Sequence, residues 1–91
     1  MGILADHGID ENRMAEVLRM LTENKIWIDN NYDSICKQYG NKFIAVMDKK
    51  IVDADTNRVR LEEVLKKSYS SREFEEILIE YVNSKNYTLL L

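Results

Sequence analysis

The chain has 91 residues, enough for one domain with a thin hydrophobic core, so oligomerisation would be a natural supplement to its stability. Hydrophobic residues make up 45% of it and charged residues 32%, which excludes a disordered chain, and no apolar run reaches membrane-spanning length. The net charge of −3 argues against a dedicated nucleic-acid-binding protein. Cys36 is the only cysteine, which excludes a disulfide within the chain and fits a reducing cytoplasm.

The first helix is expected over residues 9–25, after a loose lead-in over residues 1–8. Its apolar stripe recurs at helical spacing between Glu11 and Glu23, at Met14, Val17, Leu18 and Leu21. Met20 lies off this stripe, so it could widen the apolar surface into a partner-binding face.

A second helix is expected from Trp27 to Tyr39, because Asn24-Lys25 interrupts the pattern of the first helix. Its apolar and aromatic residues share one face, at Ile28, Tyr32, Ile35 and Tyr39. Gly40 follows directly and predicts a left-handed residue that ends the helix.

The segment from Lys42 to Ala54 predicts a β-hairpin. The stretch Phe43 to Met47 is apolar on both faces, which is typical of a central strand. Asp48-Lys49-Lys50 has the polarity and length of a turn, and the second strand, Ile51 to Ala54, carries Asp53, which indicates a sheet edge. A buried helix would give a similar apolar run, but the β-branched content and the flanking turn signals favour strands.

A third helix is expected from Arg58 to Tyr69, because three capping residues, Asp55-Thr56-Asn57, precede it. Its apolar stripe consists of Leu61, Val64 and Leu65. Ser70 and Glu73 then have the spacing of a capping box.

A third strand is expected from Ile77 to Val82, with Glu80 facing water, and Tyr87 to Leu91 is expected as a fourth short strand or an apolar tail. A right-handed crossover carries the third strand past the first, which predicts the sheet order 2-1-3. The whole chain, residues 1–91, therefore predicts a single α+β domain of order α-α-β-β-α-β with a three-stranded antiparallel or mixed sheet. The helix at 58–69 should cover one face, and the N-terminal helices should cover the other face or mediate a dimer.

A tryptophan-led helix begins at Trp27-Ile28, includes Asn31-Tyr32-Asp33, and precedes the strand motif Tyr39-Gly40-x-Lys42-Phe43-Ile44-Ala45-Val46. This pattern resembles a family of small uncharacterised prokaryotic domains, common in archaea. The similarity covers residues 27–82 and leaves the first helix and the tail at 83–91 outside. The chain lacks the family's proline beside Tyr39 and its glycine in the hairpin turn. The resemblance implies an αββαβ core in an archaeal or bacterial cytoplasmic protein, and it implies no activity, because the family has no assigned function.

The sequence Asp53-x-Asp55-x-Asn57 imitates the start of a calcium-binding loop. Such a loop needs a glycine at its sixth position and a glutamate at its twelfth, where this chain has Arg58 and Val64. Helix capping is therefore the favoured role of these residues.

No catalytic, cofactor or metal site is predicted. His7 is the only histidine and Cys36 the only cysteine, so a zinc site within one chain is not expected, and Cys36 is expected as a small core residue rather than a nucleophile. Glu62 and Glu63 point apart on a helix and do not converge on one proton.

The sequence favours a non-enzymatic protein-interaction module that forms a homodimer or binds another protein, without a cofactor. Trp27 is expected as a core anchor, with an interface anchor as the rival interpretation. The candidate interface residues are Met14, Leu18, Met20, Trp27, Tyr87 and Leu89. The alternative is a nucleic-acid-associated regulator, and its candidate contacts are Lys49, Lys50, Arg58, Arg60, Lys66 and Lys67. A small enzyme is the third and least favoured hypothesis.

Overall fold

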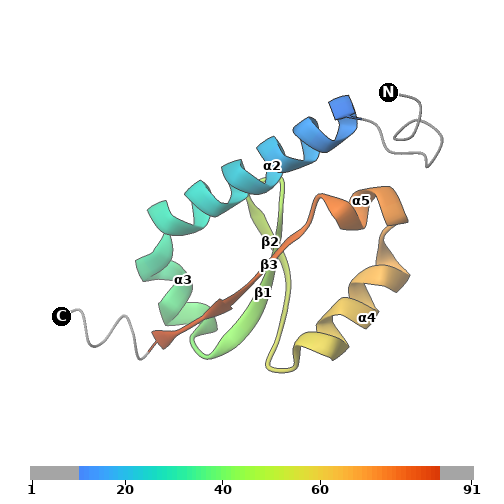
Figure 1. Cartoon of the computed structure of the whole chain (residues 1–91). Helices are drawn as coiled ribbons and strands as arrows, with labels where there is room; N and C mark the ends of the chain where they lie inside the picture. The colour runs from blue at the N-terminus through green and yellow to red at the C-terminus, as the bar shows by residue number, and fades with distance from the viewer. Residues whose placement is uncertain (1–10, 85–91) are drawn as a thin grey trace.

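A computed structural model describes residues 11–84 of the chain, and Figure 1 shows how its elements are arranged. In chain order the elements are α2 (Glu11–Asn30), α3 (Tyr32–Tyr39), β1 (Lys42–Met47), β2 (Lys50–Asp55), α4 (Arg58–Ser68), α5 (Ser71–Glu75) and β3 (Leu78–Val82). The predicted α+β class and order of elements are confirmed, with one short additional helix, α5, before β3. The expected lead-in at 1–8 and the expected fourth strand at 87–91 lie outside the described residues.

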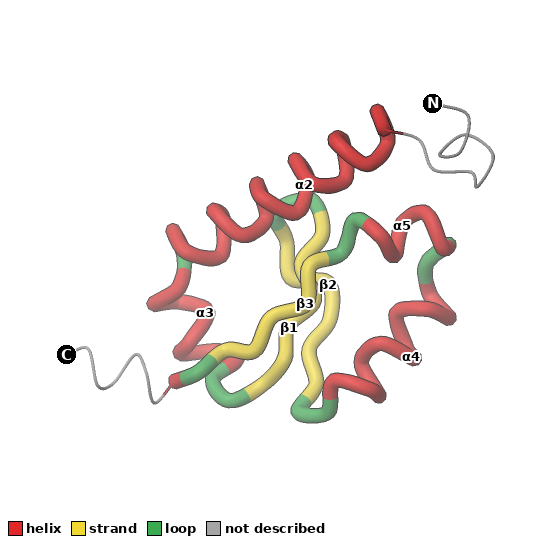
Figure 2. The backbone as a smooth tube through the Cα atoms, viewed as in Figure 1, coloured by secondary structure: helices red, strands yellow, loops and turns green. Residues whose placement is uncertain are grey.

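The first strand, β1, lies at the centre of the sheet. The strand order is β2-β1-β3 and β1 is antiparallel to both neighbours, which confirms the predicted order 2-1-3. Ile44, Ala45 and Val46 are completely buried, although successive side chains of a strand point to opposite faces. Both faces must therefore be covered, and Figure 2 shows helices on either side of the strands.

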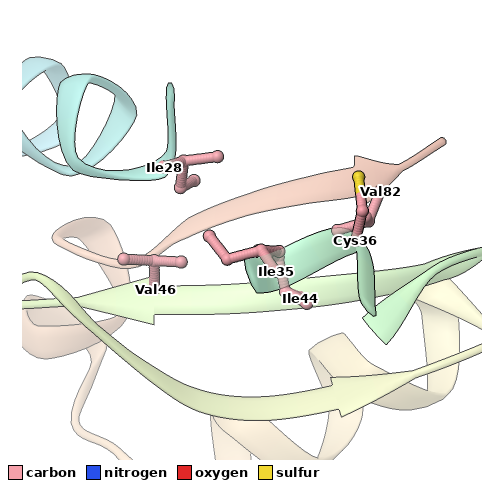
Figure 3. Packing of buried hydrophobic residues seen from close by; sticks show 6 residues of the cluster. All are labelled: Ile28, Ile35, Cys36, Ile44, Val46 and Val82. Carbon is pink, nitrogen blue, oxygen red and sulfur yellow. The ribbon is translucent and has the colours of Figure 1, made fainter. Parts of the chain in front are cut away.

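Each face of the sheet has its own hydrophobic cluster. The cluster beneath α2 and α3, shown in Figure 3, consists of Ile28, Ile35, Cys36, Ile44, Val46 and Val82. The cluster beneath α4 consists of Ala45, Leu61, Leu65 and Ile77. The described part of the chain is thus a three-layer domain, with both N-terminal helices on one face of the sheet and α4 on the other.

The break between the first two helices does not lie at Asn24-Lys25, where the sequence predicts it. Helix α2 runs without interruption through these residues, because the side chain of Asn24 accepts a hydrogen bond from the hairpin turn that outweighs its weak helix propensity. The helix ends at Asn30, and Asn31 forms the turn that follows it. The backbone N–H of Asn31 donates to the carbonyl of Trp27 at 3.1 Å, and its side-chain Nδ2 donates to the same carbonyl at 2.8 Å.

The left-handed residue after α3 is Asn41, with φ 65°, and not Gly40, whose φ is −54°. Gly40 follows the end of the helix as predicted, but the prediction that it adopts a left-handed conformation is wrong. Glycine is required there by a close approach of the chain, since a Cβ atom on Gly40 would lie 2.8 Å from the carbonyl oxygen of Cys36 and 3.0 Å from Cβ of Ser84.

The hairpin turn is one residue shorter than the sequence predicts. Asp48 and Lys49 form it, both with positive φ (54° and 59°), and Lys50 already pairs with Met47 as part of β2. Positive φ at both central positions is the geometry of a type I′ turn, which matches the twist of the flanking strands but normally uses asparagine, aspartate or glycine. A register shift between Ala45 and Val46 then leaves one extra residue in β2, a β-bulge.

Caps fix the ends of the later helices as predicted. Asn57 accepts a hydrogen bond from the N–H of Arg60 at 3.1 Å and caps α4, and Ser70 and Glu73 form the expected capping box at the start of α5. Glu80 of β3 is half-buried and does not simply face water, because its carboxylate lies 3.0 Å from Nζ of Lys25.

Candidate interaction surfaces

Asn24 joins helix α2 to the hairpin turn. Only 2% of the residue is exposed, and its Oδ1 accepts a hydrogen bond from the backbone N–H of Lys49 at 2.9 Å. Its Nδ2 lies 3.5 Å from the carbonyl oxygens of Val46 and Glu76, which are long contacts. The buried amide therefore ties the middle of α2 to the hairpin turn at the edge of the sheet and to the residue that follows α5.

Asn24 supports a backbone conformation that Lys49 adopts at a cost. A side chain at positive φ crowds its own carbonyl oxygen, so L-residues other than glycine avoid this region. The hydrogen bond from the Lys49 N–H is available only while the turn keeps its shape, and it stabilises that shape. As a result the backbone of Lys49 is held beside α2, and the residue lines three hollows of the surface.

The first of these hollows is a groove of about 370 Å³ between the α2–α3 elbow and the hairpin, called here the Trp27 groove. Its lining residues are Trp27, Asn31, Ser34, Ile35, Gln38, Tyr39, Lys49, Lys50 and Ile51. Two of them are lysines and none is a carboxylate, so the lining is positive although the chain as a whole carries −3. Trp27 packs against the hydrophobic cluster with part of its surface and lines the groove with another part.

The bulge in β2 keeps acidic side chains out of the Trp27 groove. Ile51 pairs with Val46, and both pack against the cluster beneath α2 and α3. Strict alternation would bring Asp53 to the same side as Ile51, but the extra residue shifts the register, and Asp53 pairs with Ala45 of the opposite face. Because of this shift, β2 contributes an apolar residue and Lys50 to the groove, and its aspartates lie under α4.

A second hollow, of about 300 Å³, lies between α2, the turn and α5. It is mainly acidic, and its lining residues are Met20, Glu23, Asn24, Met47, Asp48, Lys49, Glu73 and Glu76. Arg13 lies nearby and bridges α2 to α5, with its guanidinium 2.9 Å from Glu76, 3.0 Å from Glu16 and 2.9 Å from the carbonyl of Arg72. Burial lowers the pKa of Arg13, but hydrogen bonds to Glu76 and Glu16 outweigh this effect and raise it. The acidic residues of α5 therefore have a structural partner.

The outer face of α2 is a separate, apolar surface. Met14 and Leu18 are 52% and 58% exposed, and Ile26 is 53% exposed further along the helix. An adjacent face of the same helix carries Asn24 and Ile28 into the core. Met14 and Leu18 therefore extend the apolar stripe of α2 beyond the part that packs on the core, onto an exposed side of the helix.

The structure does not bring the candidate interface residues together into one patch. Met14 and Leu18 share the outer face of α2, whereas Met20 and Trp27 line the two hollows near the turn. Tyr87 and Leu89 lie outside the described residues.

The candidate nucleic-acid contacts are also divided. Lys49 and Lys50 lie at the hairpin turn, while Arg58 and Arg60 follow the opposite end of β2. Both arginines have carboxylate partners, Glu62 at 2.9 Å from Arg58 and Asp55 at 2.7 Å from Arg60. Lys66 lies over the ring of Phe74, with Nζ 5.5 Å from the ring centroid, and Lys67 is exposed at the end of α4.

The residues with potential chemistry have local structural roles. Cys36 is buried in the cluster beneath α3. Asp53 accepts a hydrogen bond from the following N–H, and Asp55 binds Arg60 and the N–H of Asn57. Between residues 11 and 84, no three histidine, cysteine or acidic side chains meet in a way that could hold a metal ion, and no helix is long and apolar enough to cross a membrane.

Comparison with protein-family models, with curated proteins and with solved structures found no match to this chain. The candidate surfaces therefore rest on geometry alone. Sequence reasoning missed the joint role of Asn24 and Lys49. One signal was present: Asn24 has helical spacing to the buried Ile28 and to Leu21, which marks a polar residue on the core face.

Proposed function

We propose that this protein is a non-enzymatic interaction module that forms a homodimer through the outer face of α2. The observation that carries the proposal is the exposure of Met14 and Leu18 on a helix whose adjacent face already fills the core. Large apolar side chains that adjoin one another on a surface are typical of protein–protein contacts. A chain of this length also gains stability from association.

A second copy of α2 fits this face in the antiparallel direction. A two-fold axis at Leu18 places this residue against Leu18 of the second copy, and Met14 then lies opposite Thr22. The same register places Glu11 opposite Lys25. Lys25 is half-exposed beside Asp29 and Glu80, so its ammonium group remains accessible to a further carboxylate. The pairing is thus apolar at its centre and complementary in charge at both ends.

Light scattering over a range of protein concentrations tests the proposal. We expect the native chain to shift from monomer to dimer as its concentration rises. Leu18→Glu should weaken dimerisation by about a hundredfold or more, because it would bury two unpaired carboxylates. Val59→Glu is the matched control, since Val59 is 64% exposed on α4, away from the proposed interface. A chain that stays monomeric at millimolar concentration, or a control that dissociates the dimer equally, would refute the proposal.

The nucleic-acid alternative has less support, because the basic residues lie at opposite ends of β2 and the net charge is negative. A cytoplasmic location is part of the proposal and is supported by the single, buried cysteine. The resemblance of residues 27–82 to small prokaryotic domains likewise stays a prediction, which concerns the fold and supports no activity.

A further inference from the structure

We propose that the Trp27 groove binds an extended acidic peptide segment of another protein, with an apolar side chain against Trp27 and carboxylates on Lys49 and Lys50. This surface is distinct from the outer face of α2, so the inference does not depend on dimerisation. It assigns to the interaction module a second binding site and the chemistry of its partner.

Charge selects an anionic occupant. The groove contains two lysines and no acidic residue among its lining residues, in a chain with an excess of acidic groups. The nearest aspartates of β2 are turned to the opposite face of the sheet by the bulge. An acidic ligand therefore meets two cations without a competing carboxylate from the lining, which favours its encounter and its orientation.

The backbone conformation of the turn supports a role of the Lys49 side chain in ligand binding. Glycine would adopt the same positive φ without steric cost, yet the chain has lysine there and holds it with the buried amide of Asn24. Strained residues that the surrounding structure holds in place are typical of ligand-binding sites. Lys49 lines the Trp27 groove together with Trp27, and the same two residues, with Glu23, also line a smaller hollow of about 210 Å³.

The shape of the site favours an extended peptide. Lys50 and Ile51 of β2 form one wall of the groove, and β2 is an edge strand of the sheet, so its outer backbone groups can pair with an added strand. The opposite wall offers the aromatic rings of Trp27 and Tyr39 together with polar groups of α3. Alternate side chains of a peptide strand would thus meet an apolar floor, while the others reach the lysines at the rim.

Trp27 is the only tryptophan in the chain, so its fluorescence reports directly on the occupancy of the groove. The probe is a short peptide that alternates leucine with glutamate and contains no aromatic residue. We expect a saturable change in the Trp27 emission with this peptide, and none with the same peptide carrying lysine in place of glutamate. The acidic peptide should bind Leu18→Glu as it binds the native chain, which separates this inference from the proposed dimer.

Charge reversal at the rim provides the first variant. Lys49→Glu combined with Lys50→Glu should weaken binding of the acidic peptide about tenfold or more, because two charge-assisted contacts become repulsive. The matched control reverses two exposed lysines elsewhere, Lys37→Glu on α3 and Lys67→Glu on α4, and therefore changes the net charge equally. Equal weakening by both double variants would mean that the net charge, and not the groove, governs binding, and would overturn the inference.

Lys49→Gly separates binding from folding. This variant relieves the backbone of the turn and removes one cation, so the thermal unfolding temperature should stay the same or rise while peptide binding weakens. Undiminished binding by a folded Lys49→Gly chain would overturn the proposal. It would also be overturned if a single-stranded oligonucleotide of equal charge bound more tightly than the peptide, or if the Trp27 emission did not respond to the peptide at all.

Discussion

At the scale of single residues, a buried amide and a missing side chain decide the local structure. Asn24 is a polar residue on the core face of a helix, a position that is normally apolar, and it is tolerated because it makes hydrogen bonds there. Gly40 is a small residue at ordinary backbone angles, and it is required because two other parts of the chain approach it. Neither role follows from the residue's usual preference.

The hydrogen bond between Asn24 and the turn predicts a measurable loss of stability when Asn24 is replaced. Asn24→Ala removes the acceptor for the N–H of Lys49 and leaves a cavity, so the free energy of unfolding should fall by about 2 kcal/mol. Asn30→Ala, the same change at an exposed position of α2, is the control and should change it by less than about 0.5 kcal/mol. Urea unfolding followed by circular dichroism measures both free energies, and equal effects would show that the hydrogen bonds of Asn24 do not stabilise the fold.

Gly40 predicts a steric effect. Gly40→Ala should destabilise the protein by about 1–3 kcal/mol, because the new methyl group overlaps the carbonyl of Cys36, which is backbone and cannot rotate away. Removing the second neighbour with Ser84→Gly in the same chain should recover only part of this loss. Thermal unfolding of the single and double variants tests this, and full recovery would mean that Ser84 alone limits the space.

At the scale of elements, hydrogen bonds between residues close in sequence determine where helices and strands begin and end. Asp55 closes β2 and also binds Arg60 of α4, so one carboxylate joins the strand to the helix that crosses over the sheet. The hydrogen bond from Arg60, helped by the N–H of Asn57, lowers the pKa of Asp55 well below its ordinary value of 3.8.

This pKa shift gives a prediction about pH. A carboxylate whose pKa is lowered by folding stabilises the folded state above its unfolded pKa, and this contribution is lost as the pH falls below about 4. Asp55→Asn should therefore be less stable than the native chain at pH 7, and its stability should fall less steeply between about pH 5 and pH 2. Glu63→Gln, at an exposed position of α4, is the control. Parallel urea-unfolding profiles for native and Asp55→Asn chains would contradict the prediction.

One extra residue in β2 decides on which face of the sheet Asp53 lies. With strict alternation, Ile51 and Asp53 would share a face, and the Trp27 groove would contain a carboxylate. The bulge places Asp53 on the face beneath α4, so that Lys49 and Lys50 are, among the described residues, the only charged ones that line the groove. The charge of a surface can therefore depend on strand register as much as on composition.

At the scale of the whole molecule, the three layers bury most of the large apolar side chains of residues 11–84, and those left exposed lie on α2 (Met14, Leu18 and Ile26), on α4 (Val59 and Val64) and on β3 (Tyr81). The sheet uses both faces for the core, and α2 contributes one face to it. The two surfaces proposed for binding are the outer face of α2 and the Trp27 groove at the hairpin end. They lie on different sides of α2, so a dimer and a bound peptide can coexist.

Much of the architecture was predictable, because the rules behind it are local or general. Alternation identified β1 as covered on both faces, and the handedness of the crossover placed β3 beside it. The continuation of α2 through Asn24 was not predicted in this way, since the N–H that donates to its side chain lies 25 residues further along the chain. Three lining residues of the Trp27 groove were predicted separately, Trp27 as a possible interface anchor and Lys49 and Lys50 as possible nucleic-acid contacts, but not as one site.

The sequence by itself determined the order of elements apart from the short helix α5, the sheet order and the capping residues Asn57 and Ser70. Periodicity and capping act between near neighbours, and the handedness of a crossover is a general rule. Only the tertiary structure decided where α2 ends, why residue 40 is glycine and which lysines meet Trp27. Each of these depends on groups that are distant in the chain, and folding brings such groups together in a geometry that no local pattern records.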